Sequence, residues 1–357
     1  MKNGKKWGCA CLGLTLAAIV LFGGLTAVID PLFHYHKPLA GLGYSIWDER
    51  YQNDGIVKHF DYDAIITGSS MCENFKTSEM DALFGTNAVK VCYSGSSYRE
   101  LCSNLQRAAD ANDQLRTVLI GLDLGVMVRP WDEMRSDVPY PDYLYDDVLL
   151  NDASYLLNKE ILLRYTVRTL QHTFYGFETT SFDDYSAWNG EFGAQAVMKE
   201  VVRGPAAQQR ELTEQEAQMV RENIRRNVVE LAEANPQITF HCFIPPYSIV
   251  YWDIQNRAGR CQAQVDALRI AAEELLSCDN IRLYAFWEEP WCLDLDNYSD
   301  YFHYGPQINS QILQKIHNNE NRITRENADE YWDGLERYFG DFDYDGYFAK
   351  LEADGKI

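Results

Sequence analysis

The sequence predicts an α/β fold in which a parallel β-sheet has helices on both faces and is preceded by a membrane-spanning helix. Three observations lead to this fold class. Short apolar runs rich in Val, Ile and Phe recur along the chain, stretches with helical spacing separate most of them, and a long uncharged segment lies near the N-terminus. Because there are five such runs, we expect a flavodoxin-like, three-layer domain with a five-stranded sheet.

The predicted strands and helices alternate along the chain. The strands are AIIT (64–67), AVKVCY (88–93), TVLIGL (117–122), ITFHCFI (238–244) and IRLYAF (281–286). Apolar residues at helical spacing predict helices over 97–111 and 265–276. Thr213 and Glu216 form a capping box ahead of a helix that reaches about Ala234. Strands that alternate with helices pair in parallel.

The N-terminal segment predicts a membrane anchor. Residues 7–29 contain no charged residue over 23 positions, and about 20 apolar residues suffice to cross a bilayer. We therefore expect residues 1–29 to form a cytoplasmic tip and a single transmembrane helix. A cleaved signal peptide is the alternative, but its apolar core is usually about 7 to 15 residues long, and LTAVIDP is a poor cleavage site. The basic residues before the span keep the N-terminus in the cytoplasm and the remaining chain outside the cell membrane: Lys2, Lys5 and Lys6.

Composition narrows the possible partners. The chain has 53 Asp and Glu against 32 Lys and Arg, so its surface repels polyanions and we expect no nucleic-acid partner. The nine cysteines include no C-x-x-C pair and do not form a disulfide framework. Cys92 and Cys242 lie in apolar runs, where we expect small buried side chains.

The rest of the chain divides around the sheet. Residues 30–60 are expected to be a membrane-proximal linker, and its His34 and His36 lack the Cys or carboxylate neighbours of a metal site. Residues 61–316 form the α/β domain. Its tyrosine-rich insertion, about 124–212, is too long for a simple loop, so we interpret it as a cap over the site or, alternatively, as a helical decoration.

Residues 317–357 are an acidic, aromatic tail. The segment DFDYDGYFAKLE matches the calcium-loop pattern, with candidate ligands Asp341, Asp343, Asp345 and Glu352. Only five residues follow Glu352, too few for the second helix of such a motif. The interpretation we favour is a tail that packs on the domain.

The chemistry is expected at the carboxyl ends of the strands, where ligands of parallel sheets bind. The first strand is followed by Gly-Ser-Ser ending at Ser70, the second by Gly95 and the third by Asp123, and Asp300 and His303 follow the fifth. A serine hydroxyl needs an imidazole to take its proton, and the imidazole needs a carboxylate on its second nitrogen. The catalytic candidates are therefore Ser70, Asp300 and His303, and the amides of Ser70 and Gly95 are candidate oxyanion donors.

These motifs, in this order, resemble the SGNH (GDSL-like) hydrolase superfamily over about residues 60–316. The family places Gly-x-Ser, a glycine, Gly-x-Asn and Asp-x-x-His at positions that correspond here to Gly68–Ser70, Gly95, Gly121–Asp123 and Asp300–His303. The resemblance implies an SGNH hydrolase fold and a serine esterase or acyltransferase activity without a metal or other cofactor. Within the family, the chain looks most like membrane-anchored members that act on cell-envelope polymers, such as alginate O-acetyltransferases and the D-alanyl transfer protein of teichoic acids.

The chain departs from the family pattern at Asp123. An ionised carboxylate would repel the oxyanion that the family's Asn stabilises, so the third oxyanion donor is in doubt. The sequence thus predicts a membrane-anchored, extracytoplasmic serine acyltransferase or esterase that acts on O-acyl groups of an envelope glycan or related polymer. The alternative is a catalytically inactive scaffold that binds glycan or a polytopic membrane acyltransferase.

Overall fold

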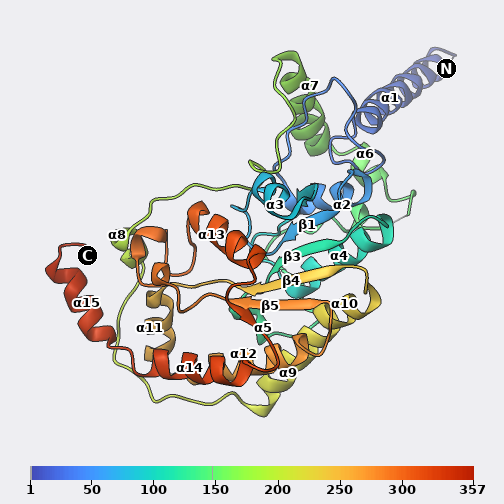
Figure 1. Cartoon of the computed structure of the whole chain (residues 1–357). Coiled ribbons are helices and arrows are strands. Elements are labelled where there is room, and N and C mark those ends of the chain that lie inside the picture. Colours follow the sequence, from blue (N-terminus) through green and yellow to red (C-terminus); the bar gives the residue numbers. More distant parts are fainter. Residues whose placement is uncertain (1, 147) are drawn as a thin grey trace. The chain divides into compact units, whose positions relative to one another are not determined.

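The computed structural model describes residues 2–146 and 148–357 (Figure 1). Met1 and Asp147 lie outside the described residues, and so do the side chains of Lys2 and Asn3. The predicted role of Lys2 in keeping the N-terminus in the cytoplasm therefore falls on a side chain that is not described. The chain forms two compact units. The first contains the chain up to Asp61 together with Ser136–Tyr185, and the second contains Tyr62–Arg135 and Ser186–Ile357.

The second unit is built on a mixed, mostly parallel sheet with strand order β2-β1-β3-β4-β5-β6. Its strands are β1 (Ala64–Thr67), β2 (Ala88–Lys90), β3 (Thr117–Gly121), β4 (Thr239–Ile244), β5 (Ile281–Ala285) and β6 (Arg322–Ile323). β1 to β5 pair in parallel, which confirms the α/β class, and β6 pairs antiparallel with β5. β6 was not predicted, because two residues are too few to show a strand pattern.

The sheet is covered on both faces. Neighbouring strand residues point to opposite faces, and both Ile65 and Ile66 of β1 are fully buried. This burial explains why the strands appear in the sequence as continuous apolar runs. Cys92 and Cys242 are buried and unbonded to any other cysteine, as predicted.

Two helices of the second unit, α4 (Tyr98–Ala111) and α9 (Glu214–Ile224), begin directly after a capping residue, whereas the helix predicted over 265–276 begins earlier and spans Cys261–Leu275. Ser97 caps α4, and Thr213 forms the predicted capping box, in which the Glu216 N–H donates to Thr213 Oγ1 at 3.2 Å. The long helix predicted after Thr213 reaches Ala234 in three consecutive segments. The described helices are α3 (Thr77–Phe84), α4 (Tyr98–Ala111), α5 (Leu124–Met127), α8 (Ala194–Met198), α9 (Glu214–Ile224), η3 (Arg225–Val229), α10 (Glu230–Ala234), α11 (Ile249–Arg257), α12 (Cys261–Leu275), η4 (Pro290–Cys292), η5 (Leu295–Asn297), α13 (Pro306–His317), α14 (Ala328–Gly340) and α15 (Tyr344–Ala353).

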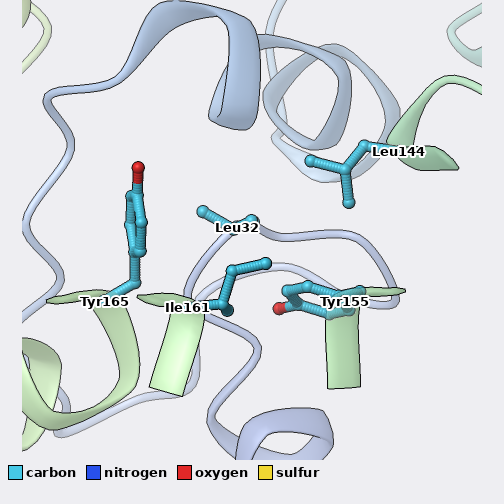
Figure 2. Close-up of a cluster of buried hydrophobic side chains, with 5 residues drawn as sticks. All are labelled: Leu32, Leu144, Tyr155, Ile161 and Tyr165. Carbon is cyan, nitrogen blue, oxygen red and sulfur yellow. The ribbon is translucent and has the colours of Figure 1, made fainter. Parts of the chain in front are cut away.

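The first unit joins segments that are far apart in sequence. It contains α1 (Lys2–Ile29), α2 (Glu49–His59), η1 (Asp142–Leu144), α6 (Ala153–Leu156), η2 (Ile161–Thr166) and α7 (Val167–Phe174). Its buried core brings Leu32 against side chains of the insertion (Figure 2): Leu144, Tyr155, Ile161 and Tyr165. The segment predicted as a linker therefore contains a helix and contributes to a folded core.

Residues 30–36 form a tight turn around a buried carboxylate in this unit. Asp30 is fully buried, accepts the backbone N–H groups of residues 34 to 36 and receives the Tyr155 hydroxyl at 2.6 Å. His34 Nε2 lies 3.3 Å from Asp152 Oδ1. The histidine segment thus helps to hold the first unit together.

Helix α1 is the feature of the first unit that concerns membranes. One described helix, Gly4–Ile29, is long and apolar enough to cross a membrane. Its early turns leave large apolar side chains exposed, among them Trp7, Leu14 and Val20.

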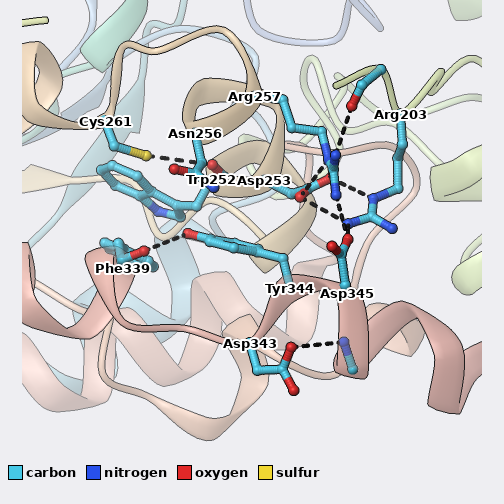
Figure 3. Close-up of polar contacts among 12 residues, drawn as sticks. Arg203, Trp252, Asp253, Asn256, Arg257, Cys261, Phe339, Asp343, Tyr344 and Asp345 are labelled. Carbon is cyan, nitrogen blue, oxygen red and sulfur yellow. Dashed lines mark hydrogen bonds and ion pairs between the residues drawn. The ribbon is translucent and has the colours of Figure 1, made fainter. Parts of the chain in front are cut away.

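The segment predicted as a C-terminal tail belongs to the second unit: it supplies β6 to the sheet and then packs on the unit as two helices, α14 and α15. The Phe339 ring stacks on Trp252 with centroids 3.9 Å apart, and the Tyr344 hydroxyl donates to the Phe339 carbonyl (Figure 3). Within the calcium-like pattern, Asp343 accepts the Gly346 N–H at 2.9 Å as the N-cap of α15, and Asp345 is ion-paired with two arginines. The pattern is therefore a helix start, and two of its four acidic side chains, Asp343 and Asp345, already have protein partners.

Candidate active site

The predicted catalytic residues meet in the second unit. Ser70 Oγ lies 2.8 Å from His303 Nε2, and His303 Nδ1 lies 2.6 Å from Asp300 Oδ2. When Nδ1 carries the proton shared with Asp300, Nε2 is left to accept the proton of the Ser70 hydroxyl. The fold thus aligns a hydroxyl, an imidazole and a carboxylate in the order required for nucleophilic catalysis.

The turn after β1 presents Ser70 because its glycine has no side chain. Gly68 has a φ of +150°, and a Cβ atom there would overlap the Cys72 side chain. The turn is closed by the Cys72 N–H, which donates to the Ser69 carbonyl at 2.9 Å. Ser69 is buried and Ser70 is partly exposed. Of the two serines, Ser70 is therefore the one that a substrate can reach.

The loop that carries His303 is ordered by Asp300. One oxygen of its carboxylate accepts the backbone N–H groups of Phe302 at 2.9 Å and His303 at 2.8 Å, while the other contacts the imidazole. Burial favours the neutral acid, but the hydrogen bonds and charge of His303 outweigh it and lower the pKa of Asp300 below its usual value. Asp300 therefore stays ionised and orients the imidazole.

Gly95 reaches the Ser70 turn because pairing continues beyond the end of β2. The Tyr93 N–H donates to the Gly68 carbonyl at 2.9 Å. Gly95 has a φ of +60°, and a Cβ atom there would meet the Arg135 guanidinium. Among residues 2–146 and 148–357, the backbone N–H groups of Ser70 and Gly95 donate no hydrogen bond. Both are available for an oxyanion.

Asp123 lines the same pocket but is engaged as an acceptor. Tyr247 donates its hydroxyl to Asp123 Oδ1 at 2.8 Å. Burial raises the pKa of Asp123, while its interactions with Ser69 and Tyr247 and the charge of His303 oppose the rise. Because Asp123 accepts the Tyr247 hydroxyl, this geometry does not supply a third oxyanion donor from Asp123.

The pocket around Ser70 has a volume of about 530 Å³. Its wall includes several aromatic side chains, and Arg129 and Arg135 contribute positive charge to it. Arg135 Nη1 donates to the Ser94 carbonyl at 2.5 Å and thereby supports the Gly95 loop. The aromatic wall consists of Tyr247, Tyr251, Tyr301 and Phe302.

Trp188 is a site residue that sequence reasoning missed. Its Nε1 donates to the Ser70 carbonyl at 3.1 Å, its backbone N–H donates to Asn74 Oδ1 at 2.9 Å, and its ring meets that of His303 edge-on at 5.4 Å. A lone tryptophan in an irregular segment shows no local pattern. Asn74, which follows the Ser70 turn, was the accessible clue, because a polar side chain next to a buried turn needs a partner.

The chain matches no family model, no curated protein and no solved structure. In the part of the chain that the structure describes, no group of three or more His, Cys, Asp or Glu side chains is placed to hold a metal ion.

Proposed function

We propose that the protein is a membrane-anchored SGNH-type serine acyltransferase or esterase that acts on O-acyl groups of an envelope glycan or related polymer. The observation that carries this proposal is the hydrogen-bonded series Ser70–His303–Asp300, with distances of 2.8 Å and 2.6 Å. It lies beside two unused backbone N–H groups and opens into a pocket. Acyl transfer requires a nucleophile, a base, a carboxylate that orients the base, and oxyanion donors.

The first half of the reaction makes an acyl-enzyme. Ser70 Oγ attacks the ester carbonyl while His303 Nε2 takes its proton. The oxyanion accepts hydrogen bonds from the N–H groups of Ser70 and Gly95, and Asp300 stabilises the imidazolium. When the intermediate collapses, the C–O bond to the alcohol breaks and His303 returns the proton to the departing oxygen.

The second half transfers the acyl group. An acceptor hydroxyl, or water, loses its proton to His303 and attacks the acyl carbonyl. The tetrahedral intermediate then collapses, Ser70 leaves, and His303 returns the proton to Ser70 Oγ. A glycan hydroxyl as acceptor makes the protein a transferase, and water makes it an esterase.

The arrangement of the strands supports the SGNH part of the proposal. The five parallel strands have the order 2-1-3-4-5, which is the order of flavodoxin-like doubly wound sheets. Ser70, Gly95 and Asp123 follow three adjacent strands, β1, β2 and β3, where the order of the chain reverses. An added antiparallel edge strand such as β6 is common in otherwise parallel sheets.

The membrane anchor favours acyl transfer to a glycan over hydrolysis by water. A tether raises the effective concentration of the protein near acyl groups carried across the bilayer, for example by a polytopic membrane acyltransferase. Trp188, Arg129 and Arg135 of the insertion flank Ser70 and support a partial exclusion of water from the acyl-serine. We therefore propose a single-pass cell-membrane protein whose second unit faces outward.

Transfer and hydrolysis are separated by following the acyl group. We expect slow hydrolysis of p-nitrophenyl acetate, faster acyl transfer when an envelope glycan is added, and loss of both in Ser70→Ala. Mass spectrometry of the glycan measures the transfer. Rapid hydrolysis that no acceptor diverts would make the protein an anchored esterase.

Asp123 favours a second candidate function, an inactive scaffold, because a carboxylate replaces the expected oxyanion donor. A fluorophosphonate probe tests this directly, since it labels only an activated serine. Labelling of the full-length protein that survives in Ser69→Ala and disappears in Ser70→Ala supports the enzyme. A folded protein that never labels supports the scaffold.

A further inference from the structure

We propose that residues 161–177 of the first unit form a second membrane contact, an interfacial helix that inserts its exposed apolar stripe into the outer boundary of the bilayer crossed by α1. The inference concerns a surface separate from the Ser70 site. It rests on the membrane anchor of the proposed function. Four observations within the first unit lead to it.

The first observation is that η2 and α6 pack against the C-terminal end of α1. Thr26 of α1 is 0% exposed, and its Oγ1 lies 3.4 Å from Thr166 Oγ1 of η2. A Cβ atom on Gly23 would lie 3.2 Å from the Leu157 side chain, so a larger residue there would force Leu157 to shift. The last two turns of α1 are therefore covered by the insertion on one face.

The second observation is the length of the uncovered part. The charge-free stretch begins at Trp7, so 23 − 7 = 16 residues precede Gly23. At a rise of about 1.5 Å per residue they span roughly 24 Å, which is less than the ~30 Å of a bilayer's hydrocarbon core. The span must then include the turns around Gly23 and Thr26. The segments packed on these turns lie at the depth of the outer bilayer boundary.

The third observation is an apolar stripe without a protein partner. η2 and α7 form one continuous helical stretch in which Tyr165, Thr166 and Thr169 are buried. A different face carries apolar residues at intervals of four, three and four: Leu163, Val167, Leu170 and Phe174. Leu163 is 62% exposed, Leu170 37% and Phe174 84%. Tyr175 and Phe177, which follow α7, are exposed as well.

The fourth observation is the kind of residue that flanks this stripe. Arg164 and Arg168 are exposed on the same helical stretch, and their guanidinium carbons lie 5.1 Å and 5.7 Å from the Trp47 ring centre. Arginine, tryptophan and tyrosine are typical of the headgroup layer, where their apolar parts meet acyl chains and their polar ends meet water. A lipid surface therefore fits both the stripe and its basic edge.

The test places a fluorophore on the stripe of the full-length protein in nanodiscs. Cys9 and Cys11 are changed to Ser, and the other seven cysteines are buried. Single cysteines are then introduced as Leu170→Cys, Phe174→Cys and, on the polar side of the same helix, Gln171→Cys. Each is labelled with an NBD dye. Phe174 and Gln171 are exposed and Leu170 is 37% exposed, so the changes remove few buried contacts.

We expect the dyes at 170 and 174 to be quenched by spin-labelled lipids and to be severalfold less accessible to iodide than the dye at 171. Equal iodide access at all three positions would overturn the inference. Protection from iodide without quenching by lipids would overturn it too, because a protein partner would then cover the stripe.

A dye at Val20→Cys on α1 separates this inference from the anchor. Lipid quenching at position 20 without quenching at 170 and 174 refutes the interfacial contact alone. Absence of lipid quenching at position 20 refutes the anchor and the inference with it. The serine chemistry is measured independently in the same samples by fluorophosphonate labelling.

Discussion

At the scale of single residues, the candidate site depends on groups that act together. In the proposed mechanism, Ser70 gains nucleophilicity from His303, which Asp300 holds by a hydrogen bond. The neighbouring Ser69 is buried, which makes it an internal control for the site.

We expect Ser70→Ala and His303→Ala each to lower kcat by about 10⁴-fold or more, because members of a triad act as a unit. Asp300→Asn should lose a similar or smaller factor. Ser69→Ala should change kcat little. Ester hydrolysis and acyl transfer measured on purified protein check these values. If Ser69→Ala were inactive and Ser70→Ala active, the nucleophile would be Ser69.

Trp188 is expected to act as a positioning residue. Trp188→Phe removes the hydrogen bond to the Ser70 carbonyl and keeps a ring beside His303. A lost hydrogen bond of ~1 kcal/mol corresponds to about a fivefold lower kcat, with KM nearly unchanged. Phe192→Leu is the matched control, because Phe192 is partly exposed and stacks on Trp188 with ring centroids 6.3 Å apart. An equal loss of kcat in both variants would mean that the packing around the site is disturbed generally, and not that the hydrogen bond to Ser70 matters.

Gly95 is expected to be irreplaceable in the site. Gly95→Ala places a side chain at a φ of +60° and against Arg135, so the loop and its N–H group must shift. Loss of one oxyanion donor costs about 10²-fold in kcat. Gly125→Ala in the same pocket is the control, since a Cβ atom there meets nothing within 4 Å. Measurements of kcat and of thermal unfolding for both variants check this prediction. An unchanged kcat in Gly95→Ala would contradict it.

At the scale of elements, α9 shows how local hydrogen bonds fix the start of a helix. The capping box of α9 is strengthened by Arg210, whose guanidinium contacts both carboxylate oxygens of Glu216 at 2.7 Å and 2.8 Å. This ion pair, together with the cap hydrogen bonds, lowers the pKa of Glu216 to about 2.

The lowered pKa of Glu216 predicts an acid-dependent stability. Because the folded-state pKa lies below the unfolded value, the contribution is present above about pH 4.5 and is lost as the pH falls toward 2. Glu216→Gln should lower the free energy of unfolding by ~1 kcal/mol at neutral pH and by much less near pH 2. Urea unfolding in detergent measures both. Glu214→Gln, at an exposed position of the same turn, should change the free energy of unfolding at neither pH. A loss of stability in Glu216→Gln that is the same at both pH values would contradict the predicted pH dependence.

At the scale of the second unit, a charge network joins three distant segments. Asp253 of α11 is 1% exposed in its side chain and pairs with Arg203 and Arg257, which also contact Asp345 of α15 (Figure 3). The network holds the C-terminal helix against α11 through the extended segment that carries Arg203.

Asp253→Asn should destabilise the protein by about 3 kcal/mol, because two guanidinium groups lose their buried counter-ion. Asp345→Asn is the control, since its side chain is 80% exposed and water can replace it. Denaturant unfolding of the two variants compares them. Equal, small effects would show that the tail is held by its aromatic contacts alone.

Across the whole molecule, the sequence by itself determined the features that leave a local trace. The five parallel strands are buried on both faces, so each appears as an apolar run. The capping boxes at Ser97 and Thr213 are local hydrogen-bond patterns. The predicted site residues follow strand ends, and parallel strands bring their carboxyl ends to one edge.

Only the tertiary structure decided the rest. It combined residues 30–61 with 136–185 in one unit, added β6 to the sheet, bound Trp188 to the Ser70 turn and gave Asp123 the Tyr247 hydroxyl as a donor. None of these contacts repeats along the chain or lies within one helical turn. Periodicity and capping report on a residue's near neighbours, whereas contacts across a hundred residues depend on how complete elements pack, and that packing has no signature in any short stretch of sequence.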